Sequence, residues 1–262
     1  MPMANVNGTR INYELTGPDG AAVVTMSHSL SATYRMWDPQ MPALKSYRVL
    51  RFDTRGHGGS AAPDAAYTLS QLAEDAYQLI VSLGIKKTHF MGLSMGGMIA
   101  QTLALAHPEI LTSLILCDTS SGYPAGGPNL WAERIETARK TGLGGPVEGT
   151  IERWFSPDFA AKNAVLVDPI RAMIKNTPKE GYIGCCHAIS KLNLTNLISQ
   201  IKLPTLIIVG SDDPGTPVAM HEIIHQKIKG SELVILPGAR HLPNIELADA
   251  FNQVLTGFLA KH

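Results

Sequence analysis

The chain has 262 residues, of which 45% are hydrophobic and 17% are charged. This composition can bury a large core and excludes a disordered protein. Lys plus Arg and Asp plus Glu both number 22, so the charge balance gives no indication of binding to nucleic acid or to an anionic membrane. We expect a small-molecule partner. The length is also within the range of one catalytic domain that carries an insertion.

The cysteines and the N-terminus bear on the cellular setting. Cys117, Cys185 and Cys186 lack the spacing of a metal site or a CxxC motif, and adjacent cysteines rarely pair. Reduced thiols and a cytoplasmic location are therefore expected. Residues 1–5 do not begin an export signal, and no apolar run reaches the roughly 18 residues that span a bilayer. We expect neither export nor membrane anchoring, and the sequence leaves the oligomeric state open.

Short apolar runs bounded by turn residues predict the strands. Residues 5–15 predict a strand pair turned at Asn7-Gly8, a dipeptide that accepts the positive φ angles of a tight hairpin. The later runs are rich in Val and Ile and suit strands buried on both faces of a parallel sheet. These runs are 22–26, 47–52, 88–91, 111–116, 206–209 and 233–236.

Helical spacing of apolar residues follows most of these strands. It covers residues 69–83, 95–106, 221–228 and 248–259, and Thr68 or Ser70 can cap the first helix. Alternating strands and helices imply right-handed crossovers, so the fold class is α/β with a doubly wound, mostly parallel sheet.

Residues 122–195 interrupt this alternation. They show helical patterns and contain Trp131 and Trp154, but no convincing buried strand. We interpret this stretch as a helical lid over the carboxyl edge of the sheet, where open α/β sheets bind ligands. The core would then comprise residues 1–121 and 196–262.

Gly92-Leu93-Ser94-Met95-Gly96 is a GxSxG motif between a predicted strand and a predicted helix. This is the setting of a nucleophile elbow, in which the turn is too sharp for side chains at the two glycines and the serine hydroxyl is left exposed. The helix N-terminus also favours negative charge beside Ser94. Ser94 is therefore the predicted nucleophile.

A serine nucleophile needs a base, and the base needs an acceptor that orients it. With this elbow the acid and then the histidine should follow the serine, on loops that leave the last strands. The loop after residues 206–209 offers Asp212 and Asp213, and His241 follows the last predicted strand.

Two further histidines, His221 and His225, are spaced like a metal pair. They lack the HExxH pattern, so we interpret them as surface histidines and expect no metal.

An oxyanion hole needs two backbone N–H groups aimed at the developing negative charge. Met95, directly after the nucleophile, supplies one. The loop after residues 22–26 should supply the other, which makes the Leu30 amide the best candidate, with Ser29 as a possible contact of the substrate.

Arg51 to Ser60 also resembles a chemical site, because it combines Asp53, Arg55 and His57. We interpret it instead as a tight loop bracketed by Asp53 and Ser60 beside the elbow, with Arg55 bonded locally. Trp37 is interpreted as a packing residue.

Together these motifs resemble the α/β-hydrolase family and, more narrowly, the 3-oxoadipate enol-lactonases. The narrower resemblance extends over 35–40, 48–58, 92–97, 153–155, 179–182 and 241–246. It favours Asp213 as the acid, since the pattern GxxDxxTP in relatives of this fold places the aspartate there. The chain departs from the enol-lactonases at His28-Ser29-Leu30-Ser31, where they tend to have Asn-Ser-Leu-Gly, and this leaves the identity of the substrate open.

The resemblance implies hydrolysis of a carboxylate-bearing enol-lactone through an acyl-enzyme, without a metal or an organic cofactor. The lid should then bind the carboxylate, and Trp131 and Arg134 lie three residues apart on one helical face, with Trp154 as a third candidate. A general carboxylesterase for short neutral esters and a non-catalytic receptor are the alternatives. Carbon-carbon bond hydrolases and perhydrolases share the triad and also stay open, whereas Ser94 argues against a dehalogenase.

Overall fold

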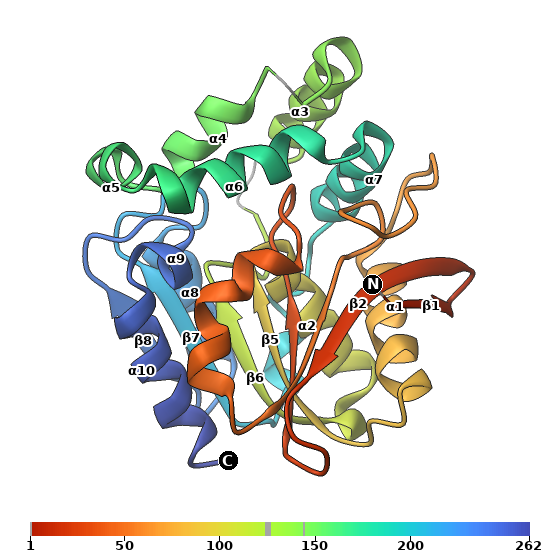
Figure 1. The fold of residues 1–262 in the computed structure, drawn as a ribbon, viewed down its shortest axis with the longest axis vertical. Coiled ribbons are helices and arrows are strands. Elements are labelled where there is room, and N and C mark those ends of the chain that lie inside the picture. The colour runs from red at the N-terminus through yellow and green to blue at the C-terminus, as the bar shows by residue number, and fades with distance from the viewer. Residues whose placement is uncertain (1, 124–126, 144) are drawn as a thin grey trace.

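A single eight-stranded sheet forms the centre of the computed structural model, which describes residues 2–123, 127–143 and 145–262 (Figure 1). Strand order is β1-β2-β4-β3-β5-β6-β7-β8, with β1 and β2 antiparallel to their neighbours and the other pairings parallel. The predicted doubly wound, mostly parallel sheet is thus confirmed. The strands are β1 (Met3–Val6), β2 (Thr9–Thr16), β3 (Val23–Ser27), β4 (Arg48–Phe52), β5 (Thr88–Leu93), β6 (Leu111–Cys117), β7 (Thr205–Gly210) and β8 (Glu232–Leu236).

Each face of the sheet is covered by helices that follow the strands. One face packs against α1 (Leu69–Ser82), α2 (Met95–Ala106) and α8 (Val218–Lys227). The short helix η2 (Pro108–Ile110) lies between α2 and β6, and η3 (Ile198–Gln200) precedes β7. The other face packs against η1 (Tyr34–Leu44), α9 (Pro243–Glu246) and α10 (Ala248–Leu259), with Trp37 fully buried among them as predicted. Two apolar cores therefore fix the strand ends from which the site is built.

The segment between β6 and β7 covers one end of the sheet (Figure 1). Its chain leaves and rejoins the sheet at adjacent points, because Gly122 and Asn193 form an antiparallel bridge. The limits 122–195 of the lid stay a prediction, and the two residues of this bridge lie at or near these limits. The helices of the segment are α3 (Gly127–Thr141), α4 (Val147–Trp154), α5 (Pro157–Lys162), α6 (Ala164–Asn176) and α7 (Lys179–Ser190).

Two local predictions were wrong because tertiary contacts decide them. His221 is fully buried instead of lying on the surface, since its Nε2 accepts a hydrogen bond from the Thr119 amide at 2.8 Å; His225 is exposed as predicted. Arg55 does not bond locally but pairs with the buried Asp75 of α1, with Nε 2.7 Å from Oδ2. The Ser60 hydroxyl does donate to the Asp53 carbonyl at 2.6 Å, as the bracketed loop requires.

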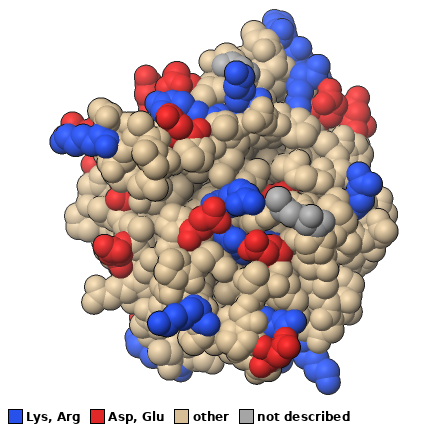
Figure 2. All heavy atoms as spheres, viewed as in Figure 1, with Lys and Arg blue, Asp and Glu red and all other residues tan. Residues whose placement is uncertain are grey.

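The charged side chains and the cysteines are distributed as follows. Basic and acidic side chains are interspersed on the face that Figure 2 shows. All three cysteines are free and buried, and burial raises the pKa of each thiol. Among the described helices, none combines the length and the apolar character that crossing a bilayer requires.

Candidate active site

Ser94 lies at the turn between β5 and α2 with φ 57° and ψ −115°. A serine with positive φ is strained, and such strain persists only where the surroundings hold it. The Ser94 amide donates to the Cys117 carbonyl at 2.9 Å, and the Ser94 carbonyl accepts from the Thr119 hydroxyl at 2.7 Å. The elbow is therefore fixed to the end of β6 as well as to its own strand and helix.

The two glycines of the motif are required by space. A Cβ on Gly92 would lie 2.1 Å from the Gly96 carbonyl oxygen, and one on Gly96 would lie 2.2 Å from the Ser27 carbonyl oxygen. Both distances are far below contact between non-bonded atoms, so any side chain would force the backbone apart. The GxSxG pattern thus has a steric reason at both ends of the turn.

His241 and Asp213 meet beside Ser94. The Nδ1 of His241 lies 2.7 Å from Oδ2 of Asp213, and the same carboxylate accepts from the Thr216 hydroxyl at 2.6 Å and the Gly215 amide at 2.8 Å. Burial, the largest single effect, would raise the pKa of Asp213, but the charge and hydrogen bond of His241 together with the bonds from Thr216 and Gly215 outweigh it and lower the pKa to about 2. Asp213 is therefore a carboxylate that three hydrogen bonds, one of them to His241, hold in place.

A second carboxyl lies close to this pair. Asp118, after β6, is fully buried, and burial with the nearby Asp213 raises its pKa well above the usual range. Asp118, Asp213 and His241 each offer an atom that lies within 4.8 Å of the others, which makes them the one group of three possible metal ligands in the described chain. Both carboxylate oxygens of Asp213 are already hydrogen-bonded, so we interpret the group as a hydrogen-bonded Asp213–His241 pair beside a second buried carboxyl.

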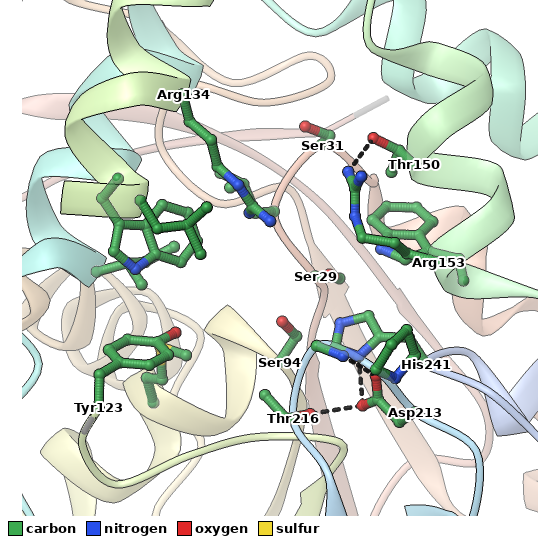
Figure 3. Close-up of a pocket in the computed structure, with 18 of the residues that line it drawn as sticks. Ser29, Ser31, Ser94, Tyr123, Arg134, Thr150, Arg153, Asp213, Thr216 and His241 are labelled. Carbon is green, nitrogen blue, oxygen red and sulfur yellow. Dashed lines mark hydrogen bonds and ion pairs between the residues drawn. The ribbon is translucent and has the colours of Figure 1, made fainter. Parts of the chain in front are cut away.

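Ser94, Asp213 and His241 line a cavity of about 430 Å³ between the sheet and the helical segment (Figure 3). The Ser94 hydroxyl and the His241 ring face this cavity from the sheet side. Apolar contacts come from Leu30, Met98 and Ile189, and the Trp154 ring lies 6.1 Å from the His241 ring. The space suits a small molecule with one face against apolar walls.

Two arginines reach the cavity from the helical segment (Figure 3). The Arg134 guanidinium lies over the Trp131 ring, 4.6 Å from its centroid, and Arg153 donates to the Thr150 hydroxyl at 2.8 Å. Burial lowers the pKa of Arg153, and the like charge of Arg134 lowers it further. Within the described chain, neither guanidinium forms an ion pair with a carboxylate, so the cavity holds uncompensated positive charge opposite Ser94.

The structure brings most of the predicted site residues to this cavity. Ser29, Leu30, Ser94, Trp131, Arg134, Trp154, Asp213 and His241 all line it. Met95 is not among the lining residues, because its side chain is fully buried. Its predicted role needs only its amide, which stands at the first position of α2 and therefore has no acceptor within the helix.

Arg153, Tyr123 and Tyr182 line the cavity but were not predicted as contacts. Arg153 stands directly before Trp154 in a stretch that resembles the enol-lactonases, and this was the available signal.

The chain supplies these groups in the order Ser94 after β5, Asp213 after β7 and His241 after β8, which is the order of the α/β-hydrolase fold. The family model described as alpha/beta hydrolase fold matches residues 22–247, and the chain belongs to this family.

Named relatives narrow the class. 3-Oxoadipate enol-lactonase 1 of Acinetobacter baylyi is 35% identical over 259 residues, covering 98% of this chain and 96% of the relative. The crystal structure of the enol-lactonase from Burkholderia xenovorans LB400 is 38% identical, covers 99% of this chain and 100% of its own, and gives a TM-score of 0.96. A thermophilic esterase from Thermogutta terrifontis, with malate bound, is 28% identical with a TM-score of 0.93, covering 100% and 99%. The chain is thus a hydrolase of small-molecule esters or lactones, which favours catalysis over the receptor alternative.

Proposed function

We propose that the chain hydrolyses a small lactone that carries a carboxylate, namely 3-oxoadipate enol-lactone, with Ser94 as nucleophile, His241 as base and Asp213 as the orienting acid. The observation that supports this most is the pair Arg134 and Arg153, which face the predicted nucleophile without a carboxylate partner in the described chain. Both guanidinium groups are partly buried, and a charge-assisted hydrogen bond to a ligand carboxylate would stabilise them. A carboxylate on the substrate supplies that bond.

The reaction follows from the positions of the groups. Ser94 attacks the ring carbonyl while His241 takes its proton, and the amides of Met95 and Leu30 stabilise the oxyanion. Within the described chain, the Leu30 amide donates to no other group, so it is free to do this. Asp213 stabilises the imidazolium that forms.

The second half of the reaction restores the enzyme. Collapse of the tetrahedral intermediate breaks the bond to the ring oxygen, which leaves as an enol and takes the proton from His241. The enol then becomes a ketone. Water attacks the acyl-enzyme as His241 removes its proton, and the same histidine returns a proton to Ser94.

The relatives support this substrate class. Two relatives from Acinetobacter baylyi and one solved structure are named as enol-lactonases, and the Thermogutta terrifontis esterase was solved with malate, a small dicarboxylate. A carboxylesterase for neutral esters is the competing function, because apolar residues such as Met98 and Ile189 line part of the cavity. A cytoplasmic location stays a prediction from the cysteines.

A matched pair of substrates separates the two functions. 3-Oxoadipate enol-lactone and 5-methyl-2(3H)-furanone share the enol-lactone ring, but only the first carries a carboxylate. We expect kcat/KM to be about 10- to 100-fold higher for the first, since a hydrogen bond to a charged group contributes about 1.5–3 kcal/mol. Efficient hydrolysis of p-nitrophenyl esters without hydrolysis of 3-oxoadipate enol-lactone would show that the lactonase proposal is wrong.

A further inference from the structure

We infer that His57, together with His28, is a positioning residue that fixes the Leu30 amide in the oxyanion hole, an inference that rests on the proposed role of that amide. The two histidines connect the loop of residues 28–32 to the loop of residues 53–60. Neither histidine lines the cavity.

The connection is reciprocal. His28, on the first loop, accepts at Nε2 from the Thr54 amide of the second loop at 2.8 Å. His57, on the second loop, accepts at Nε2 from the Ser31 amide of the first loop at 3.0 Å. The two rings lie 5.1 Å apart between centroids, and both residues are fully buried. Each loop therefore contributes one imidazole acceptor and one amide donor.

Both imidazoles need the same tautomer for this arrangement. Because Nε2 accepts, the ring proton must be on Nδ1, where His28 donates to the Ser29 carbonyl at 2.7 Å and His57 faces the Arg55 carbonyl at 3.4 Å. Burial lowers the pKa of both rings, that of His57 to about 3 with a further contribution from His28, while the Asp53 charge partly opposes the effect at His28. The rings are neutral acceptors at neutral pH.

The bond from Ser31 bears directly on Leu30. Ser31 has φ 66°, a left-handed conformation that is unfavourable for a serine. The amide of Ser31 is held by His57, and its carbonyl accepts from the Thr177 hydroxyl of the helical segment at 3.3 Å. If the acceptor at residue 57 were lost, the buried Ser31 amide would be unsatisfied and the strained turn could relax, which would move the adjacent Leu30 amide. His28, which stands where the enol-lactonases tend to have Asn, thus supplies one half of the connection.

Two polar substitutions test the inference on p-nitrophenyl acetate, a neutral probe that does not depend on the lactone assignment. In H57Q the side-chain oxygen lies near the position of Nε2 and can still accept from Ser31, whereas in H57N it lies near Nδ1 and cannot. We expect H57N to lose about 10²–10³-fold in kcat with KM changed less than about threefold, the size of a lost oxyanion donor. H57Q should retain at least tenfold more of that kcat than H57N.

Controls separate this role from a merely structural one. His89 is also a buried histidine, and its Nδ1 is bonded to the Ser113 hydroxyl at 2.8 Å near the start of β5. H89Q, whose oxygen lies near the position of Nε2 and cannot make this bond, should cost thermal stability but leave kcat within about threefold. Phenylboronic acid, whose tetrahedral adduct places an oxygen in the oxyanion hole, should bind H57N at least tenfold more weakly than wild type. Equal kcat in H57N and H57Q, or a loss confined to KM, would overturn the inference.

Two further outcomes keep the inference distinct from the proposed function. If S94A retains full activity, the proposed chemistry fails; if S94A is inactive and H57N is fully active, only the role of His57 fails. Should H57N not fold, nitrogen-15 spectra of the wild type decide. The inference is supported if Nε2 of His57 is unprotonated and if the amide signal of Ser31 shifts on addition of phenylboronic acid. A protonated Nε2 contradicts it.

Discussion

Asp213 turns its carboxylate to Nδ1 of His241 at 2.7 Å, whereas its neighbour Asp212 lies exposed and accepts a hydrogen bond from the Ser211 hydroxyl, also at 2.7 Å. Both residues lie in the turn after β7, where Asp213 is buried and Asp212 is exposed, so only Asp213 reaches the histidine. The amide of Asp212 is in turn bonded to the Ala239 carbonyl at 2.9 Å, which fixes this orientation.

The two aspartates therefore form a matched pair for mutation. D213N should lower kcat about 10³–10⁴-fold, because an amide at this position favours the wrong tautomer of His241. D212N should leave kcat within about threefold. Steady-state hydrolysis of p-nitrophenyl acetate measures both variants, and a larger loss in D212N than in D213N would mean that the acid has been assigned to the wrong residue.

The arginines of the cavity should act on binding of a carboxylate. We expect R134Q and R153Q each to raise KM for 3-oxoadipate enol-lactone about tenfold and to leave KM for 5-methyl-2(3H)-furanone nearly unchanged, since only the first substrate carries a charge. R139Q is the control, because Arg139 lies on the same helix as Arg134 but is exposed and paired with Glu136. Equal effects on both lactones would argue against a carboxylate contact.

Asp118 should limit stability at neutral pH. Its pKa is raised in the folded protein, so at pH values above about 3.8 the unfolded chain ionises first and stability falls as the pH rises towards the folded pKa. D118N removes this penalty and can keep the bond that Oδ1 accepts from the Gly210 amide at 2.9 Å.

D118N should be more stable than wild type at pH 7 and about as stable as wild type at pH 3. Urea unfolding at both pH values measures this difference. A difference in stability between D118N and wild type that is the same at both pH values would contradict a raised pKa of Asp118.

The contact between Gly56 and Gly181 joins the loop of residues 53–60 to α7. A Cβ on Gly181 would lie 2.0 Å from the Gly56 carbonyl oxygen, so G181A should lower the free energy of unfolding by about 1–3 kcal/mol. Gly257 is a helical glycine with open space around it, and G257A should raise stability by about 0.5–1 kcal/mol. Thermal unfolding distinguishes the two, and a neutral G181A would mean that α7 moves freely away from the loop.

Much of the architecture could be predicted because its signals are local. Helices α2 and α10 begin and end at the predicted residues, and the predicted strands lie within one or two residues of those observed. Ser94 and His241 were predicted for the same reason, since each follows a short apolar run that ends in turn residues. That pattern left both Asp212 and Asp213 open, and only the resemblance to the fold's relatives favoured Asp213. Such local patterns predict the elements well, because a strand buried in the sheet needs a short run of apolar residues.

The remainder depends on contacts between distant parts of the chain. The burial of His221 follows from a bond to Thr119, 102 residues away, and Arg55 finds Asp75 only when α1 packs beside the loop. The helix η1 contains Pro39 and Pro42, which hide its periodicity. Arg153 reaches the cavity only because α4 lies over the sheet, and no spacing along the chain predicts that placement.

The burial of all three thiols has a practical consequence. Cys117, Cys185 and Cys186 should react slowly with maleimides, because each is covered and held as the protonated thiol. A cysteine introduced at Val165, whose side chain is 87% exposed on α6, would then be the fast-reacting site in an otherwise native background. A fluorophore attached there would report how far the helical segment moves when a ligand enters the cavity beneath it.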